Sequence, residues 1–167
     1  MKDVFSDRIA DVPRSFIREI LKVALDHSVI SFAGGLPNRH LFPVAALKEA
    51  ASKAFDVFGS DVLQYASSEG FISLRQRIAE RYRLRGLEIH PDTILITTGS
   101  QQGLDLMAKV VVNEGDGIII EEPGYLGAIQ AFSLYRPTFY PVPVSDGGMD
   151  TGALRSVLDS AAPKLMY

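Results

Sequence analysis

Ile94-Leu95-Ile96-Thr97-Thr98-Gly99-Ser100-Gln101-Gln102-Gly103 is the stretch that decides the fold. Its first half, residues 94–98, is typical of a buried strand. Gly99 predicts a sharp turn, and we expect a helix over 101–112 directly after it. A helix start carries unpaired backbone N–H groups and the positive end of the helix dipole, so a phosphate can dock there without a basic side chain. The stretch therefore predicts an anion site at the carboxyl end of a strand.

Downstream of this stretch, segments with strand and helix character alternate. We expect strands at 117–121 and 138–144 and from Lys164 onward, with helices near 127–135 and 151–160. Such alternation requires crossover connections, which place helices on both faces of a parallel sheet. The run Gly117-Ile118-Ile119-Ile120 is apolar without alternation, as expected for a strand covered on both faces. The sequence thus predicts an α/β fold with a three-layer, mainly parallel sheet.

Upstream, the pattern is mostly helical. Apolar spacing predicts an amphipathic helix over 15–27, and two further helices are expected over 45–58, just after Pro43, and over 71–85. Residues 30–33 are expected to be extended. We interpret residues 1–42 as an N-terminal helical arm and residues 43–167 as the first part of a larger α/β domain. The last residues, 164–167, look like the start of a buried strand with nothing to cover it, which suggests a truncated chain.

Composition limits the possible partners. The 167 residues are 47% hydrophobic and 22% charged, as is usual for a globular protein. A net charge of −3 gives no electrostatic reason to expect binding to nucleic acid or to an anionic membrane. The chain has no cysteine, its three histidines show no metal-ligand spacing, and no apolar run approaches the length of a membrane helix. We therefore expect a cytoplasmic protein with small-molecule partners, without a metal.

Two turns could carry chemistry, and each has a structural alternative. Ser100 could simply be the N-cap of its helix, or Gly99, Ser100 and Gln101 could hold a single phosphate. The stretch lacks the glycine spacing of dinucleotide-binding and ATP-binding loops. Tyr125, in the turn after the next strand, could cover the sheet edge or could stack on a planar ligand. A phosphate cradle beside a ring platform suggests pyridoxal 5′-phosphate.

The sequence resembles the N-terminal part of the fold-type I pyridoxal-phosphate-dependent aminotransferases, in the group that includes 2-aminoadipate and kynurenine aminotransferases. The similar strings follow the order of that family across nearly the whole chain. They are Ser15-Phe16-Ile17-Arg18-Glu19-Ile20-Leu21, Ile30-Ser31-Phe32-Ala33-Gly34-Gly35-Leu36-Pro37, Leu63-Gln64-Tyr65 with Glu69-Gly70, Leu74-Arg75, Ile96 to Asp105, and Glu122-Pro123-Gly124-Tyr125 with Gly127-Ala128-Ile129-Gln130.

The resemblance implies a role for each of several residues. The cofactor phosphate would be bound by Gly99, Ser100 and Gln101, and the cofactor ring would stack on Tyr125. Tyr65 would reach the phosphate of a second subunit, which implies a homodimer. The substrate side chain and carboxylate would be bordered by Ser15, Arg18 and Gly35.

The resemblance also implies an activity, the transfer of an amino group from an amino acid to a 2-oxo acid. The Schiff-base lysine of the family lies beyond the matching strings, and none of the six lysines here has its Ser-Lys setting. We therefore expect the full-length protein to be the enzyme and this chain alone to be inactive. Two alternatives stay open: an aminotransferase-like regulatory domain that senses pyridoxal phosphate, and a non-catalytic dimerisation partner.

Overall fold

The computed structural model describes Val4, residues 6–10, Gly35 and residues 37–167. The helix predicted over 15–27 and the extended segment at 30–33 lie outside these residues, as do Ser15 and Arg18. The chain forms two compact units, and each is described by itself. One unit comprises residues 96–167 with residues 1–13, and the other comprises residues 14–95. The predicted division between residues 42 and 43 stays a prediction.

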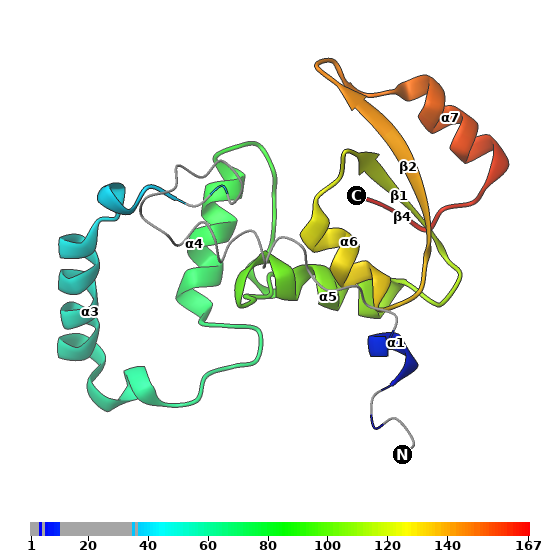
Figure 1. Ribbon diagram of the computed structural model, residues 1–167. Helices are drawn as coiled ribbons and strands as arrows, with labels where there is room; N and C mark the ends of the chain where they lie inside the picture. Colours follow the sequence, from blue (N-terminus) through cyan, green and yellow to red (C-terminus); the bar gives the residue numbers. More distant parts are fainter. Residues whose placement is uncertain (1–3, 5, 11–34, 36) are drawn as a thin grey trace, which may run out of the picture. The chain divides into compact units, whose positions relative to one another are not determined.

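The first unit is built on a four-stranded sheet (Figure 1). Its strand order is β3-β2-β1-β4, and the strands are β1 (Gly117–Glu122), β2 (Thr138–Ser145), β3 (Gly148–Met149) and β4 (Leu165–Met166). β1 pairs in parallel with both β2 and β4, whereas β2 and β3 form a short antiparallel pair. The predicted mainly parallel sheet is confirmed, although the sequence reasoning missed β3.

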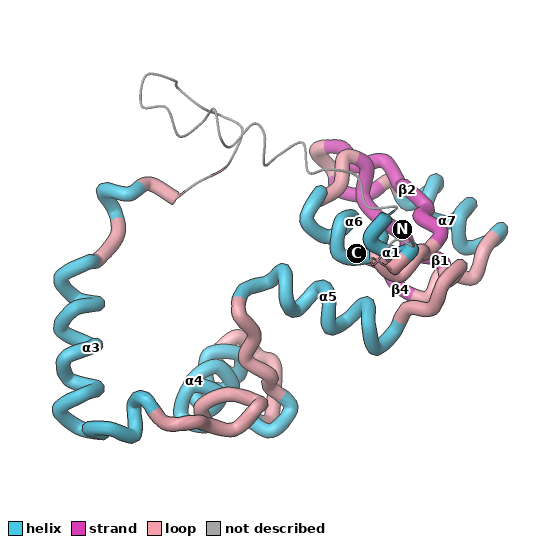
Figure 2. Tube along the Cα trace, turned by 60° about the horizontal axis from the view of Figure 1, so that its bottom comes forward, coloured by secondary structure: helices cyan, strands magenta, loops and turns pink. Residues whose placement is uncertain are grey.

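Helices cover both faces of this sheet. The helices are α5 (Gly99–Val111), α6 (Leu126–Ser133) and α7 (Thr151–Ser160), together with the short α1 (Asp7–Ala10). α6 and α7 lie on opposite sides of the strands in both views (Figures 1 and 2). The core joins Ala108 and Val112 to Ile118 of β1 and to Phe132 of α6. α5 and α6 thus pack on one side of β1, and α7 on the opposite side of the strands completes the three predicted layers. α6 begins shortly after the carboxyl end of β1, and the hydrogen bond from Gln101 to Gly127 joins the starts of α5 and α6.

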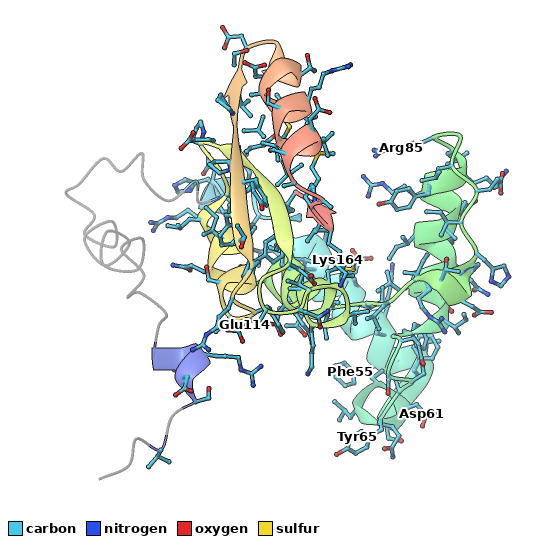
Figure 3. The ribbon with its side chains drawn as sticks, turned by 90° about the vertical axis from the view of Figure 1, so that its right-hand side faces the viewer. Phe55, Asp61, Tyr65, Arg85, Glu114 and Lys164 are labelled. Carbon is cyan, nitrogen blue, oxygen red and sulfur yellow. The ribbon has the colours of Figure 1, made fainter. Side chains whose placement is uncertain are left out.

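The last strand is tied to the beginning of β1. Lys164, labelled in Figure 3, donates its backbone N–H to the Gly117 carbonyl at 2.8 Å, and its ammonium group lies 2.8 Å from an Asp116 carboxylate oxygen. The Asp116 carboxylate also accepts the Asn113 N–H at 2.7 Å. The hydrogen bonds from Lys164 and from the Asn113 backbone hold the pKa of Asp116 below its ordinary value.

The strand predicted over residues 94–98 is wrong. Ile94 has extended backbone angles, φ −105° and ψ 125°, but the segment belongs to no ladder among the described residues. Near its end, the Gly99 N–H turns back to the Thr97 carbonyl at 2.9 Å. An apolar pattern reports only which side chains can be buried, whereas a strand also needs a partner for its backbone groups.

In the described part of the second unit, the structure contains the helices expected over 45–58 and 71–85. They are α3 (Val44–Phe58) and α4 (Ile72–Arg83), accompanied by the 3₁₀ turns η1 (Arg39–Leu41), η2 (Gly59–Leu63) and η3 (Pro91–Thr93). The buried Arg75 of α4 donates hydrogen bonds to the carbonyls of Gly70 and Pro91, each at 3.2 Å. This guanidinium therefore fixes the loop before α4 and the turn η3 to the helix.

Candidate functional site

The first turn of α5 offers backbone N–H groups that the side chain of its N-cap residue does not bind. Gly99 has φ +79°, a left-handed conformation that favours glycine, and a β-carbon built there would have no atom within 4 Å. Thr98 precedes the helix without a side-chain capping bond. Its own N–H is bound by the Gln102 side chain, and the Thr97 hydroxyl donates to the Gly99 carbonyl at 3.0 Å. The turn is thus held by its own polar groups, while the Thr98 side chain leaves the first-turn amides of α5 uncapped.

Ser100 lies inside the helix, so the interpretation of Ser100 as its N-cap is wrong. The helix begins at Gly99, two residues upstream of the expected position, and Thr98 precedes it as the N-cap residue. Ser100 is exposed, and among the described residues its hydroxyl has no hydrogen-bond partner. The hydroxyl and the backbone N–H of Ser100 are therefore both available to an anion.

Gln101 connects the start of α5 to the start of α6. Its side-chain amide donates a hydrogen bond of 2.9 Å to the Gly127 carbonyl, across 26 positions of sequence. A second link joins α5 to the residues that follow α6, since the Tyr135 hydroxyl donates to the Asp105 carboxylate at 2.9 Å. Burial, followed by this hydrogen bond, raises the pKa of Tyr135. The two links hold α6 against α5.

Tyr125 sits immediately before α6, as its N-cap residue. Its ring is 54% exposed. A β-carbon at Gly127 would lie 2.7 Å from the Cε1, Cζ and Oη atoms of Tyr125, so the ring lies against this glycine. The residue that accepts the Gln101 amide thus also supports the Tyr125 ring. The structure brings the predicted cradle and the predicted ring platform together at Gly127, a residue that the sequence reasoning did not assign to the site.

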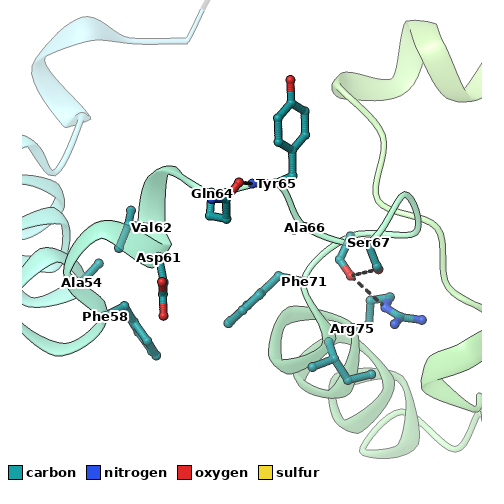
Figure 4. Close-up of a pocket in the computed structure, with 12 residues that line it drawn as sticks. Ala54, Phe58, Asp61, Val62, Gln64, Tyr65, Ala66, Ser67, Phe71 and Arg75 are labelled. Atoms are coloured by element: carbon teal, nitrogen blue, oxygen red, sulfur yellow. Dashed lines mark hydrogen bonds between the residues drawn. The ribbon is translucent and has the colours of Figure 1, made fainter.

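The other predicted site residues belong to the second unit or lie outside the described residues. Tyr65 belongs to the second unit and is 100% exposed. Figure 4 shows its ring directed away from Phe58 and Phe71. Gly35 has a left-handed φ of +56°, and a β-carbon built there would have no described atom within 4 Å. Ser15 and Arg18, the remaining substrate-binding candidates, lie outside the described residues.

A cavity of about 700 Å³ lies in the second unit, beside the Tyr65 loop (Figure 4). The rings of Phe58 and Phe71 pack edge to face there, with 6.3 Å between their centroids. Asp61 and Arg75 are among the polar residues that line the cavity. None of the α5 residues lines this cavity. This cavity is therefore separate from the predicted phosphate site at the start of α5.

The family profile described as aminotransferase class I and II matches residues 27–167. The chain belongs to this aminotransferase family. It is 41% identical over 165 residues to the 2-aminoadipate transaminase of Thermus thermophilus, covering 99% of this chain and 40% of that protein. The crystal structure of LysN, the alpha-aminoadipate aminotransferase from the same organism, complexed with N-(5'-phosphopyridoxyl)-L-leucine, superposes with a TM-score of 0.85 at 42% identity. That match covers 98% of this chain and 39% of the other.

The chain is also similar to a transcriptional regulator. An uncharacterized HTH-type transcriptional regulator of Escherichia coli, YdcR, is 34% identical over 133 residues, which is 80% of this chain and 28% of the regulator. The chain spans about two fifths of the aminotransferases it matches and less of the regulator. Within the described residues, no helix is long and apolar enough to cross a membrane.

Proposed function

We propose that this chain provides the phosphate-binding and ring-binding part of a pyridoxal 5′-phosphate-dependent aminotransferase. The observation that carries the proposal is the junction at Gly127, where the Gln101 amide and the Tyr125 ring meet next to the start of α5. The residues present fit the cofactor, since it has a phosphate for exposed helix-start amides and a flat ring for an exposed tyrosine.

Each group in this junction has a distinct task. The N–H groups of Ser100 and Gln101 and the Ser100 hydroxyl would bind phosphate oxygens, while the left-handed Gly99 aims the helix start at them. The Gln101 side chain is already committed to Gly127, so Gln101 would serve the phosphate through its backbone. Tyr125 would orient the ring and exclude water from one of its sides. When bound, the cofactor supplies the electron sink for moving an amino group between an amino acid and a 2-oxo acid.

We also propose the partners that the resemblance implies. A homodimer would place Tyr65 at the phosphate of the second subunit, and the full exposure of this side chain supports that role. Ser15, Arg18 and Gly35, from the arm over residues 1–42, would border the substrate. An arginine suits a dicarboxylic amino acid, because its planar fork pairs with a carboxylate through two hydrogen bonds. The similarity to 2-aminoadipate transaminase supports the same class of donor.

These 167 residues alone would bind the phosphate end of the cofactor without transaminating. The lysine that the reaction requires is not matched by any of the chain's own lysines, which are Lys2, Lys22, Lys48, Lys53, Lys109 and Lys164. Transamination from 2-aminoadipate to 2-oxoglutarate, assayed with this chain and added cofactor, should therefore give no product above the rate without protein.

Calorimetric titration with pyridoxine 5′-phosphate tests the proposal. This compound has the ring and the phosphate but no aldehyde, so it cannot condense with surface lysines. We expect saturable binding, with pyridoxine binding at least about tenfold more weakly because it lacks the phosphate. Absence of saturable heat with pyridoxine 5′-phosphate, at concentrations up to the millimolar range, would refute the assignment.

The similarity to the bacterial regulator favours a second candidate, a sensing domain that binds the same cofactor to control transcription. Both candidates require the junction at Gly127, but only a regulator requires DNA. The net charge of −3 argues against DNA contact by these residues. Retarded migration of a DNA fragment in the presence of this chain, abolished by added salt, would reverse the order of the two candidates.

A further inference from the structure

The Tyr125 ring lies close to Gly127. A β-carbon built on Gly127 would lie at the same distance, 2.7 Å, from Cε1, Cζ and Oη of that ring. Within the ring plane, a point equally far from three consecutively bonded atoms lies within about a bond length of each. The β-carbon position at Gly127 therefore lies out of the ring plane, on one side of it, beside the Cε1–Cζ edge and the hydroxyl. Gly127 of α6 thus limits how far the Tyr125 ring can move toward that side.

This arrangement requires glycine at position 127. Real β-carbons do not approach other atoms as closely as 2.7 Å, so any side chain at this position would have to displace the ring. Gly127 has no left-handed φ, so the requirement is steric and does not come from the backbone angle. The absence of a side chain at Gly127 leaves room for the tyrosine ring.

The backbone of Gly127 is itself fixed from the phosphate side. The Gln101 side chain donates its 2.9 Å hydrogen bond to the Gly127 carbonyl, and Gln101 lies in the first turn of α5. The position of the ring is thus set relative to the same helix start that offers its amides to a phosphate. A change at Gln101 or at Gly127 would shift the ring without touching the amides.

We propose that Gln101 and Gly127 are positioning residues that fix the face and the height at which Tyr125 stacks on the ring of a phosphorylated pyridine. The proposal rests on the proposed function. It makes the site selective for ligands whose phosphate and flat ring have one fixed separation. Inorganic phosphate needs only the α5 amides, so its affinity should not depend on the position of the Tyr125 ring.

The first test needs no ligand. In nuclear magnetic resonance spectra of the wild-type chain, the ring current of a tyrosine this close to Gly127 shifts the glycine α-protons from their usual positions. We expect this shift to vanish in Tyr125→Leu. In Gly127→Ala the Tyr125 ring signals should move, whereas Gly147→Ala should leave them unchanged, because at Gly147 the nearest atom to a built β-carbon is 3.9 Å away. An unshifted Gly127 in the wild type would overturn the ring position.

The second test adds pyridoxine 5′-phosphate. We expect Gly127→Ala and Gln101→Met each to weaken its binding by about tenfold, and Gly127→Ala to leave the affinity for inorganic phosphate unchanged. The methionine keeps the length of Gln101 and removes only the donor, so it serves if Gly127→Ala does not fold. Unchanged affinity for pyridoxine 5′-phosphate in both variants would overturn the positioning role. If the wild type binds no pyridoxine 5′-phosphate, the proposed function fails, and the ligand-free shift at Gly127 still decides the ring position.

Discussion

Replacing Gly99 by alanine, with Gly115→Ala as the control, distinguishes the effect of the left-handed turn on stability from its effect on phosphate binding. Gly99 and Gly115 have nearly the same backbone angle, φ +79° and +84°, and a β-carbon at either would have no atom within 4 Å. Neither substitution therefore adds a clash, and both force alanine into the left-handed region. That conformation costs about 1–2 kcal/mol, offset by about 0.4–1 kcal/mol from the stiffer unfolded chain. We expect each variant to lose about 1 kcal/mol of unfolding free energy.

Only Gly99→Ala should change ligand binding. The left-handed conformation of alanine at position 99 is strained, and any relaxation of φ toward negative values would turn the peptide groups that begin α5 and tilt their N–H groups away from a bound phosphate. We expect binding of inorganic phosphate and of pyridoxine 5′-phosphate to weaken about tenfold in Gly99→Ala and to stay unchanged in Gly115→Ala. The two variants lie in the same unit, so a general loss of stability would affect both equally.

Stability is best measured by urea titration followed through the amide signals of Ile118, Ile119 and Ile120, which report the first unit alone. Affinity is measured by calorimetry below the unfolding transition. Equal destabilisation with unchanged phosphate binding in both variants would refute the role of the α5 start. A Gly99→Ala variant as stable as the wild type would show that the turn is not left-handed.

Three further predictions follow from contacts in the first unit. Tyr125→Leu should weaken binding of pyridoxine 5′-phosphate by about 0.5–1.5 kcal/mol in calorimetry, and Tyr125→Phe should not, since stacking needs the ring and not the hydroxyl. Tyr135→Phe should lower the unfolding free energy by about 1–2 kcal/mol, because the Asp105 carboxylate loses its donor; an unchanged urea midpoint would contradict this. The lowered pKa of Asp116 stabilises the fold above the ordinary value of 3.8, and this contribution disappears as the pH falls below it toward the folded-state pKa. Asp116→Asn should flatten that acid dependence of the unfolding free energy, and a slope identical to that of the wild type would count against the Lys164 contact.

The parts of the fold that local patterns control could be predicted. α5, α6 and α7 and the central strands β1 and β2 have apolar runs or spacings long enough to identify, and the structure contains them within one or two residues at most boundaries. β3 has only two residues, and its hairpin with β2 is too short to give a periodic signal. Residues 94–98 show the opposite error, in which the pattern of a strand is present without a ladder among the described residues.

The two turns of the candidate site could be predicted from the sequence, but the contacts that join them at Gly127 could not. The glycine turn before α5 and the tyrosine after β1 each carry a local signal. The hydrogen bond from Gln101 to Gly127 spans 26 positions, and the contact of Tyr125 with Gly127 depends on a rotamer. Neither interaction leaves a mark in composition or periodicity. A glycine two residues after an aromatic side chain in a turn is the signal that could have indicated a close approach.

The central claim is that the start of α5 binds the phosphate of a cofactor whose ring stacks on Tyr125. A crystal structure of this chain with pyridoxine 5′-phosphate tests it most directly. The account predicts phosphorus density within hydrogen-bonding reach of the Ser100 and Gln101 amides, with the pyridine ring on the face of Tyr125 opposite Gly127. Phosphorus density at any other place, or a ring that makes no contact with Tyr125, would contradict it.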